Sequence, residues 1–306
     1  MRSTMILALA AVCAISPALS PAWADPIEGR RAPSEIVAAA NAEDWLRLDP
    51  ANIAVFELER GAVVVQLFDR YAPKNAAQFR LLARAGFYDG LSFYRVIDGF
   101  VAQGGDPFGE RALPEGASKT LPGEFAAAAD ESDLEPLVRL GDDYADYAGI
   151  ADGVAYGVDE QSRRVWPLHC AGVLAFGREE GRDTASSEFY FTLQPQRYLD
   201  RNLSVFGRVL SGMAHLQALT RTAPPEKKSD PLGERIARVW IADAPPEGAT
   251  PPKWEVFRTD TALFTEYVEA RRNRPEGFFH FRPDHVNACA LAIPAREAPE
   301  QGASDG

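Results

Sequence analysis

Arg95 and Gln103 are two polar side chains whose types and spacing could serve one chemical step, and both lie in the run FYRVIDGFVAQGGD, residues 93–106. An arginine is always charged and presents several N–H donors in a rigid fork. A glutamine can hold a carbonyl group or orient the arginine. An arginine in a strand is more often an exposed surface charge. The pair therefore becomes a candidate site only through the residues around it.

Other kinds of chemistry find little support in the sequence. It contains no CxxC and no HExxH motif, and no Ser/His/Asp or paired-carboxylate arrangement of the kind that supports nucleophilic or acid–base catalysis. The four histidines, His169, His215, His280 and His285, are scattered along the chain, which disfavours a metal site. We therefore expect no metal site.

The first 24 residues have the pattern of an export signal. Arg2 precedes an apolar stretch over residues 5–15, and small residues at 22 and 24 predict a cut after Ala24. Serines and prolines from residue 16 onward interrupt the apolar run well before the roughly 20 residues that a membrane span needs, although a retained anchor is the alternative. We therefore expect a periplasmic protein that begins at Asp25 and has no membrane span after cleavage.

Two cysteines, Cys170 and Cys289, remain after removal of the signal. An oxidising compartment permits a disulfide between them. Both also lie in apolar stretches, where a buried free thiol is equally ordinary. The sequence leaves both possibilities open.

Composition bounds the class of protein. The 306 residues are 46% hydrophobic and 25% charged, which is typical of a globular chain with a substantial core. Acidic residues outnumber basic ones by 44 to 32, giving a net charge of −12. Nucleic-acid binding relies on clustered lysine and arginine, so a nucleic acid is not an expected partner.

The central part of the sequence predicts a mainly β fold. Residues 53–58 and 62–68 alternate with a period of two and form a predicted hairpin, and Pro73 and Gly86 delimit a predicted helix. Further strands are predicted at residues 92–97, 100–103, 172–176, 189–193, 204–210 and 235–242, with a second helix at 213–220. Eight strands and two amphipathic helices favour a closed, eight-stranded antiparallel β-barrel capped by two α-helices.

Three segments lie outside a minimal barrel domain of residues 53–244. Residues 25–52 form a leader with a predicted helix at 33–48. Residues 106–168 are an insertion with ten acids and one base between residues 130 and 160, which favours a solvated acidic loop. Residues 245–306 form a C-terminal extension with a predicted helix at 259–274, too small to bury a core alone. We expect it to pack on the barrel as an appendage.

Several motifs, in order, resemble those of one family. The run at 93–106 closely resembles the F-H-R-I-I-x-G-F-x-x-Q-G-G-D signature of the cyclophilin-type peptidyl-prolyl cis-trans isomerases. APKN at 72–75 with Phe79 is similar to the start of the family's helix, and SEFYF at 187–191 to its S-Q-F-F-I strand. YLD at 198–200 and VFGRV at 205–209 resemble W-L-D and V-F-G-x-V. The resemblance covers residues 53–244 without the insertion.

The resemblance implies isomerisation of X-Pro bonds in unfolded or extended polypeptides, without a cofactor. Arg95 would donate to the imide nitrogen as the amide twists, and Gln103 would hold a substrate carbonyl or orient Arg95. Residue-by-residue transfer places seven further residues at the substrate site: Phe100, Val101, Gly177, Glu188, Tyr190, Tyr198 and Leu199.

The departures from the family pattern support a second hypothesis. Glu188 replaces the usual Gln and could form a salt bridge that holds Arg95 away from the substrate. Phe176 replaces an Asn, and Tyr190, Tyr198 and Leu203 replace the usual Phe and the frequent Trp and His. The alternative function is a binding module or holdase with the same fold, which recognises proline-containing segments with little or no isomerase activity.

Overall fold

Residues 53–241 supply an eight-stranded antiparallel barrel in the computed structural model, which describes residues 27–299. The predicted signal and its cleavage site lie outside the described residues. The strand order is β13-β2-β3-β12-β10-β11-β5-β4. The strands are β2 (Ile53–Leu58), β3 (Gly61–Leu67), β4 (Ser92–Val96), β5 (Val101–Gly105), β10 (Val173–Phe176), β11 (Phe189–Thr192), β12 (Val205–Ser211) and β13 (Ile236–Ile241).

The barrel is nearly closed, because its two edge strands meet at one end. Ser92 forms an isolated antiparallel bridge with Arg235. The backbone N–H of Ile236 donates to the carbonyl of Leu91 at 2.8 Å, next to that bridge. The predicted eight-stranded antiparallel barrel is confirmed. This short contact closes it, in place of a continuous ladder of hydrogen bonds between β13 and β4.

Aromatic side chains fill the barrel. The ring of Phe56 on β2 lies 5.8 Å from that of Phe79 and 5.2 Å from that of Phe189, measured between centroids. Phe79 comes from α2 (Pro73–Arg84), which begins with the proline at its first turn, where no N–H is needed. The short helix α4 (Met213–Gln217) adds Leu216 to the same core. Both predicted helices therefore exist and pack on the barrel.

The insertion is a folded sheet rather than a solvated loop. It contains β6 (Ala127–Ala128), α3 (Glu131–Leu134), β7 (Tyr147–Ala151), β8 (Val154–Asp159) and β9 (Arg164–Pro167), in the sheet order β6-β9-β8-β7. The expectation of a solvated acidic loop is wrong, because some acids cap and pair. Asp130 accepts from the backbone N–H of Asp133 at the start of α3, and the buried Asp142 carboxylate pairs with Arg197.

The two ends of the chain join in a second sheet. β1 (Trp45–Arg47) pairs with β14 (Trp254–Phe257), which pairs with β15 (Ala295–Glu297). The helix predicted for residues 33–48 is therefore too long: α1 (Pro33–Ala38) ends early, and the chain then becomes strand because Trp45 packs on Phe257. The helix α5 (Ala262–Arg272) lies beside α1. Short 3-10 turns are η1 (Ala42–Asp44), η2 (Pro50–Asn52) and η4 (Ala288–Ala290).

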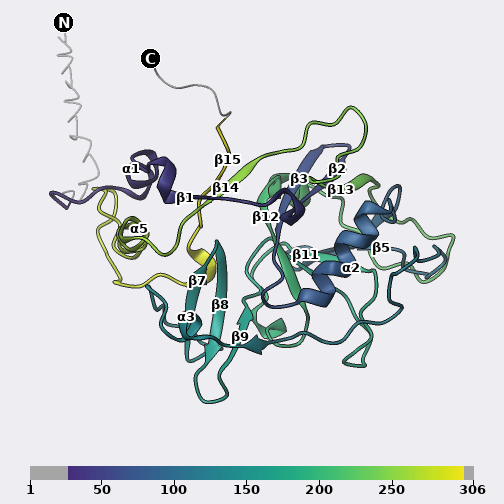
Figure 1. Ribbon diagram of the computed structural model, residues 1–306, viewed down its shortest axis with the longest axis horizontal. Helices are drawn as coiled ribbons and strands as arrows, with labels where there is room; N and C mark the ends of the chain where they lie inside the picture. Colours follow the sequence, from purple (N-terminus) through teal and green to yellow (C-terminus); the bar gives the residue numbers. More distant parts are fainter. Residues whose placement is uncertain (1–26, 300–306) are drawn as a thin grey trace, which may run out of the picture.

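The leader, the sheet-forming part of the insertion and the C-terminal extension form one unit, which we call the outer lobe (residues 27–52, 127–168 and 245–299). Its own hydrophobic cluster includes Trp45, Trp166, Phe257 and Phe264. The C-terminal extension is therefore not an appendage of the barrel alone, since it shares a core with the two other segments. Figure 1 shows this lobe on one side of the barrel, with both described ends of the chain in it.

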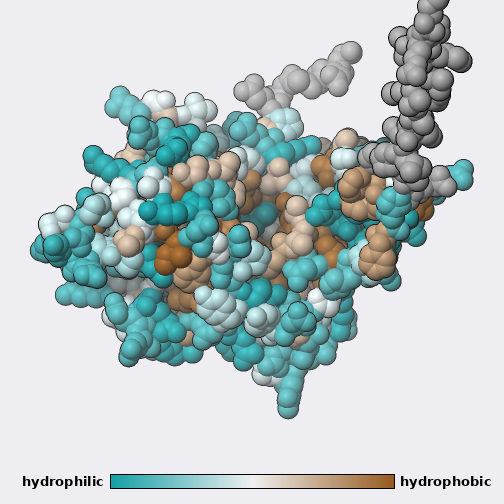
Figure 2. Space-filling model, turned by 180° about the vertical axis from the view of Figure 1, so that it is seen from behind, coloured by the Kyte–Doolittle hydropathy of each residue, from teal (hydrophilic) through white to brown (hydrophobic). Residues whose placement is uncertain are grey.

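A disulfide joins the outer lobe to the barrel. Cys170, just before β10, is bonded to Cys289 in η4, with 4.9 Å between their Cα atoms. Of the two possibilities that the sequence left open, the structure has the bridge. No helix among residues 27–299 is long and apolar enough to cross a membrane. The face shown in Figure 2 is mostly hydrophilic, with apolar side chains in patches between polar ones.

Candidate active site

Three neighbouring strands place the candidate catalytic pair. Arg95 on β4 is directly opposite Gln103 on β5, and Gln103 is directly opposite Tyr190 on β11. Along β5 and β11 the residues alternate, so that Ala102 and Phe189 point into the barrel while Gln103 and Tyr190 point outward. The three side chains therefore share one outer face of the sheet.

A break in register on β4 aims Arg95. Phe93 and Val96 both belong to the barrel core, although strict alternation would put residues three apart on opposite faces. The pairing of β4 with β5 shifts between Ser92 and Arg95. Bulges of this kind redirect side chains near functional sites. The shift leaves Tyr94 and Arg95 both on the side of the candidate site.

Arg95 is held by one polar contact and one aromatic contact. Its Nη1 donates to Oε1 of Gln103 at 3.0 Å, and its Cζ lies 5.3 Å from the centre of the Phe100 ring. Within the described chain, Arg95 has no carboxylate partner. Its remaining N–H groups are therefore available to a ligand.

A pocket of about 160 Å³ opens beside this guanidinium. Seven of the nine predicted site residues line it, namely Arg95, Phe100, Val101, Gln103, Gly177, Tyr190 and Leu199, together with Arg178 and Leu203. Tyr198 is not in the lining. It is 58% exposed, and its ring stacks on that of Phe100 at 6.4 Å, so it forms part of the rim.

Glu188, the ninth predicted residue, lies next to the pocket but does not pair with Arg95. Its Oε2 accepts from the hydroxyl of Tyr94 at 2.5 Å and from Nε2 of Gln103 at 3.1 Å. The expected salt bridge with Arg95 is thus wrong, because the Tyr94 hydroxyl and the Gln103 amide take up the carboxylate. Glu188 instead fixes the Gln103 amide so that its oxygen faces Arg95.

Burial changes the acidity of this cluster. It raises the pKa of Glu188 above its usual range, with the nearby carboxylates of Glu179 and Asp106 acting in the same direction. The bonds from Tyr94 and Gln103 oppose the shift without cancelling it. Burial, and then the Glu188 charge, raise the pKa of Tyr94, so its hydroxyl stays protonated as a donor. The Tyr94 hydroxyl was missed as a site feature, although it stands where the family signature has His.

A second feature missed from the sequence lies beneath the pocket. The hydroxyl of Tyr190 is 2.9 Å from Nε2 of the fully buried His169, whose Nδ1 is 3.0 Å from Oδ1 of Asp200. Arg197 in η3 (Arg197–Leu199) joins Asp200 at 2.7 Å and reaches Asp142 of the insertion. The one available signal was a histidine inside the apolar run Trp166-Pro167-Leu168 to Ala171.

The site can hold a small apolar ring with a charged donor at its edge. Phe100, Val101, Tyr190 and Leu199 provide the apolar walls, and Arg95 provides the donor. Among residues 27–299 no cluster of His, Cys, Asp and Glu could hold a metal ion. The arrangement suits a reaction that binds and polarises a group without forming a covalent bond to it.

Residues 53–239, more than half of the chain, match the family model described as "Cyclophilin type peptidyl-prolyl cis-trans isomerase/CLD". The chain belongs to the cyclophilin-type peptidyl-prolyl cis-trans isomerase family. This match places the pocket on β4, β5 and β11 within the part of the chain that the family shares. The matched range also spans the insertion, which interrupts the sequence of the barrel domain between β5 and β10.

Relatives from eukaryotes and bacteria carry the isomerase name. Peptidyl-prolyl cis-trans isomerase-like 1 of Homo sapiens is 30% identical over 177 residues, which are 58% of this chain and 82% of that protein. A probable peptidyl-prolyl cis-trans isomerase of Brucella suis biovar 1 is 26% identical over 203 residues, 63% of this chain and 84% of that one.

A solved structure is similar beyond the barrel. The crystal structure of cyclophilin AquaCyp293 from Hirschia baltica superposes with a TM-score of 0.65 and 26% sequence identity. The superposition covers 86% of this chain and 96% of that one. Because 86% exceeds what residues 53–239 supply, part of the outer lobe also has a counterpart in that cyclophilin.

Proposed function

We propose that this cyclophilin accelerates X-Pro isomerisation in unfolded or extended polypeptides of an exported compartment, with Arg95 as the donor to the imide nitrogen. The observation that carries the proposal is the position of the Arg95 guanidinium. It stands at the edge of an apolar pocket, oriented by Gln103 and without a carboxylate partner in the described chain. Family membership supplies the class of reaction, and this geometry supports the roles that we propose for the residues.

The chemistry requires a donor and an apolar cup rather than a nucleophile. Rotation about the X-Pro bond breaks amide resonance and has a barrier of about 18–20 kcal/mol. In the twisted state the lone pair of the imide nitrogen is localised and can accept a hydrogen bond from Arg95. Because that bond forms only in the transition state, it lowers the barrier rather than merely tightening binding. Phe100, Val101 and Leu199 would hold the proline ring away from water meanwhile.

Two departures from the family pattern, Glu188 and Phe176, favoured the binding-module alternative. The positions of both residues weaken that argument. Glu188 bonds to Tyr94 and Gln103 rather than to Arg95. Phe176 is 1% exposed and packs on Phe206 inside the barrel, with ring centroids 4.7 Å apart, so it does not line the pocket. Neither residue obstructs the guanidinium.

An isomerase assay on residues 25–306 tests the proposal. A proline peptide is followed by NMR exchange spectroscopy, which reports both binding and the rate of isomerisation. We expect exchange far faster than the uncatalysed rate, which has a time constant of tens of seconds or longer. Binding of the peptide with an unchanged rate would instead establish the holdase alternative.

The disulfide supports the exported location. Structural disulfides persist in oxidising compartments and are rare in a reducing cytosol, and Cys170 and Cys289 are bonded. Fractionation of the native host followed by N-terminal sequencing tests this part. We expect a periplasmic protein that begins at Asp25. A cytoplasmic protein that still begins at Met1 would refute it.

A further inference from the structure

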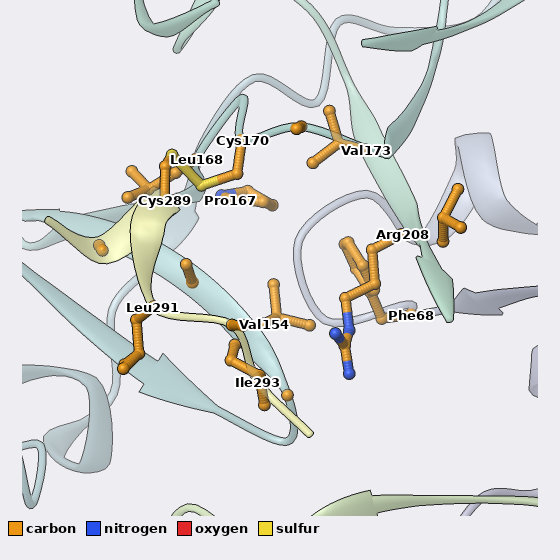
Figure 3. A pocket seen from close by; sticks show the side chains of 16 residues that line it. Phe68, Val154, Pro167, Leu168, Cys170, Val173, Arg208, Cys289, Leu291 and Ile293 are labelled. Atoms are coloured by element: carbon orange, nitrogen blue, oxygen red, sulfur yellow. A yellow bond between two sulfur atoms is a disulfide. The ribbon is translucent and has the colours of Figure 1, made fainter. Parts of the chain in front are cut away.

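A second pocket, of about 230 Å³, lies on the outer face of the barrel, away from Arg95. Three parts of the chain enclose it. They are Phe68, β10 and β12 of the barrel, the β7–β8 turn and residues 167–168 of the insertion, and residues 288–293 of the C-terminal extension next to the disulfide. Figure 3 shows Arg208 on one side of this space and the Cys170–Cys289 bridge on the other.

Arg208 is the one charged or polar side chain among the 16 residues that line the pocket. Its Nε donates to Oε1 of Gln66 at 2.9 Å. The Gln66 amide is fixed in turn, because its Nε2 donates to the carbonyl of Asp152 at 3.0 Å. The Nη2 nitrogen of Arg208 is shielded from solvent and has no hydrogen-bond partner in the described chain.

The β7–β8 turn covers Arg208, and it has a glycine at the position that lies against the guanidinium. Gly153 has a φ of +82°, and a Cβ at this position would lie 2.5 Å from Nη2 of Arg208. Only a glycine allows the β7–β8 turn to pack this closely over the guanidinium. The insertion thus buries a charge that would otherwise face solvent on the barrel surface.

Arg208 is half-buried as a residue, and it is costly to shield its Nη2 from solvent without an anion to pair with it. Arg208 forms no ion pair within residues 27–299, and burial lowers its pKa to about 10, so it remains charged at neutral pH. A buried charge is normally paired, because removing it from water costs several kcal/mol. Gln66 offers a neutral oxygen, which does not neutralise that charge.

We propose that this pocket binds a small monocarboxylate with an apolar body, its carboxylate against Arg208. The planar guanidinium fork matches a carboxylate in shape and charge. The remaining side chains that line the pocket are apolar or form the disulfide, among them Val154, Val173, Leu291 and Ile293. A free phosphate would leave most of its oxygens facing these groups without donors, which disfavours it. This site is separate from the isomerase pocket and does not depend on the proposed function.

Binding of three probes to the oxidised protein without its predicted signal tests the proposal. Hexanoate is compared with hexanamide, its uncharged counterpart, and with inorganic phosphate, by isothermal titration calorimetry at neutral pH. We expect hexanoate to bind at least tenfold more tightly than hexanamide or phosphate. In two-dimensional NMR spectra it should shift the amide signals of residues 153–155, 170–173 and 288–293 rather than those around Arg95.

Two variants separate the charge from the fold. Arg208→Gln keeps a polar side chain and should reduce hexanoate affinity at least tenfold, whereas Arg208→Lys keeps the charge and should retain part of it. If the Gln variant does not fold, the comparison of hexanoate with hexanamide on the unmodified protein still decides. Equal binding of these two probes, no binding of either, tight binding of phosphate alone, or signal shifts confined to the surroundings of Arg95 would each overturn the proposal.

Discussion

At the scale of single residues, two guanidinium groups line the candidate pocket, and they differ in what they are free to bind. Arg95 donates to one side-chain oxygen, that of Gln103. Arg178 is occupied by main-chain carbonyls, donating to those of Asn202, Glu179 and Glu180 at 2.8–3.1 Å. The free donors of Arg95, and not the mere presence of positive charge, distinguish it as the candidate for catalysis.

Arg95→Ala is therefore expected to lower kcat/KM for a proline peptide at least tenfold, which corresponds to about 1.4 kcal/mol of barrier. The melting temperature should change little, because Arg95 is only half-buried and has no ion pair in the described chain. A protease-coupled assay measures the rate. Arg178→Ala is the matched control and should lose much less activity. A larger loss in the control would move the catalytic role to Arg178.

The raised pKa of Glu188 predicts how the stability of the protein changes with pH. Its raised pKa means that the folded protein holds the carboxyl proton more tightly than the unfolded chain does. As the pH rises from about 4, near the pKa of an unperturbed glutamate, towards neutrality, the unfolded chain releases this proton first, so Glu188 contributes progressively less to folding stability. Gln keeps an oxygen that can accept from Tyr94 and Gln103 but has no proton to lose.

The melting temperature of Glu188→Gln relative to the unmodified protein should therefore rise as the pH increases over this range. Differential scanning calorimetry at a series of pH values measures it. Glu43→Gln, in which an exposed carboxylate of the outer lobe is removed, reports the general effect of deleting one negative charge. A difference that stays constant or falls with pH would contradict the assigned environment of Glu188.

At the scale of elements, the outer lobe supports the wall of the candidate pocket beside Arg95. Val101 and Tyr190 share a hydrophobic cluster with Tyr147, Val154 and Val158 of the insertion sheet. The polar chain from Tyr190 through His169, Asp200 and Arg197 to Asp142 runs through the same region. The insertion and the pocket wall are thus linked by both apolar and polar contacts.

The contact between Tyr190 and His169 should appear as a coupling energy in the free energies of unfolding of their single and double variants. Tyr190→Phe leaves a nitrogen of the buried His169 without its partner, which typically costs about 1–3 kcal/mol. His169→Leu removes the other member of the pair. Because the two residues share one contact, the double variant should be less destabilised than the sum of the singles, by at least about 0.5 kcal/mol. Urea denaturation measures all four proteins. Strict additivity would show that the contact contributes nothing.

The barrel and the site could be predicted because their signals are local. Strands β2 and β3 are apolar runs on either side of a turn at residues 59–61, Pro73 and Gly86 delimit α2, and the run at residues 93–106 carries Arg95 and Gln103. The pairing of residues 45–47 with 255–257 had no such signal, because it joins distant parts of the chain. The β7–β8 hairpin did have one, since Asp152-Gly153 is a favoured two-residue turn, but the acidic composition outweighed it.

The partners of Glu188 could not be predicted for a different reason. The sequence indicates that two side chains lie near each other, but not which of several partners a carboxylate takes. Here the break in register on β4 brings Tyr94 to the same side as Arg95. Glu188 therefore accepts a hydrogen bond from the Tyr94 hydroxyl instead of pairing with Arg95. The competition is decided by backbone geometry that no motif encodes.

At the scale of the whole molecule, one covalent link holds the C-terminal extension to the barrel. The bond between Cys170 and Cys289 closes a loop of 119 residues, which contains barrel strands β10–β13 and the segments β14 and α5. A cross-link mainly restricts the unfolded chain, and the restriction grows with the size of the loop. The bond also fixes one wall of the pocket that contains Arg208.

Replacing both cysteines by serine should therefore lower the free energy of unfolding by about 5 kcal/mol, the order that the chain-entropy model assigns to a loop of this size. Urea denaturation of the double variant and of the oxidised protein measures the difference, and the oxidised protein with added dithiothreitol controls for the substitutions themselves. Isomerase activity below the transition should persist, because neither cysteine lines the Arg95 pocket. Unchanged stability would mean that the shared core of the outer lobe already restricts the chain without the bond. Loss of activity before any unfolding would show instead that the bond positions the pocket wall through the segment between His169 and β10.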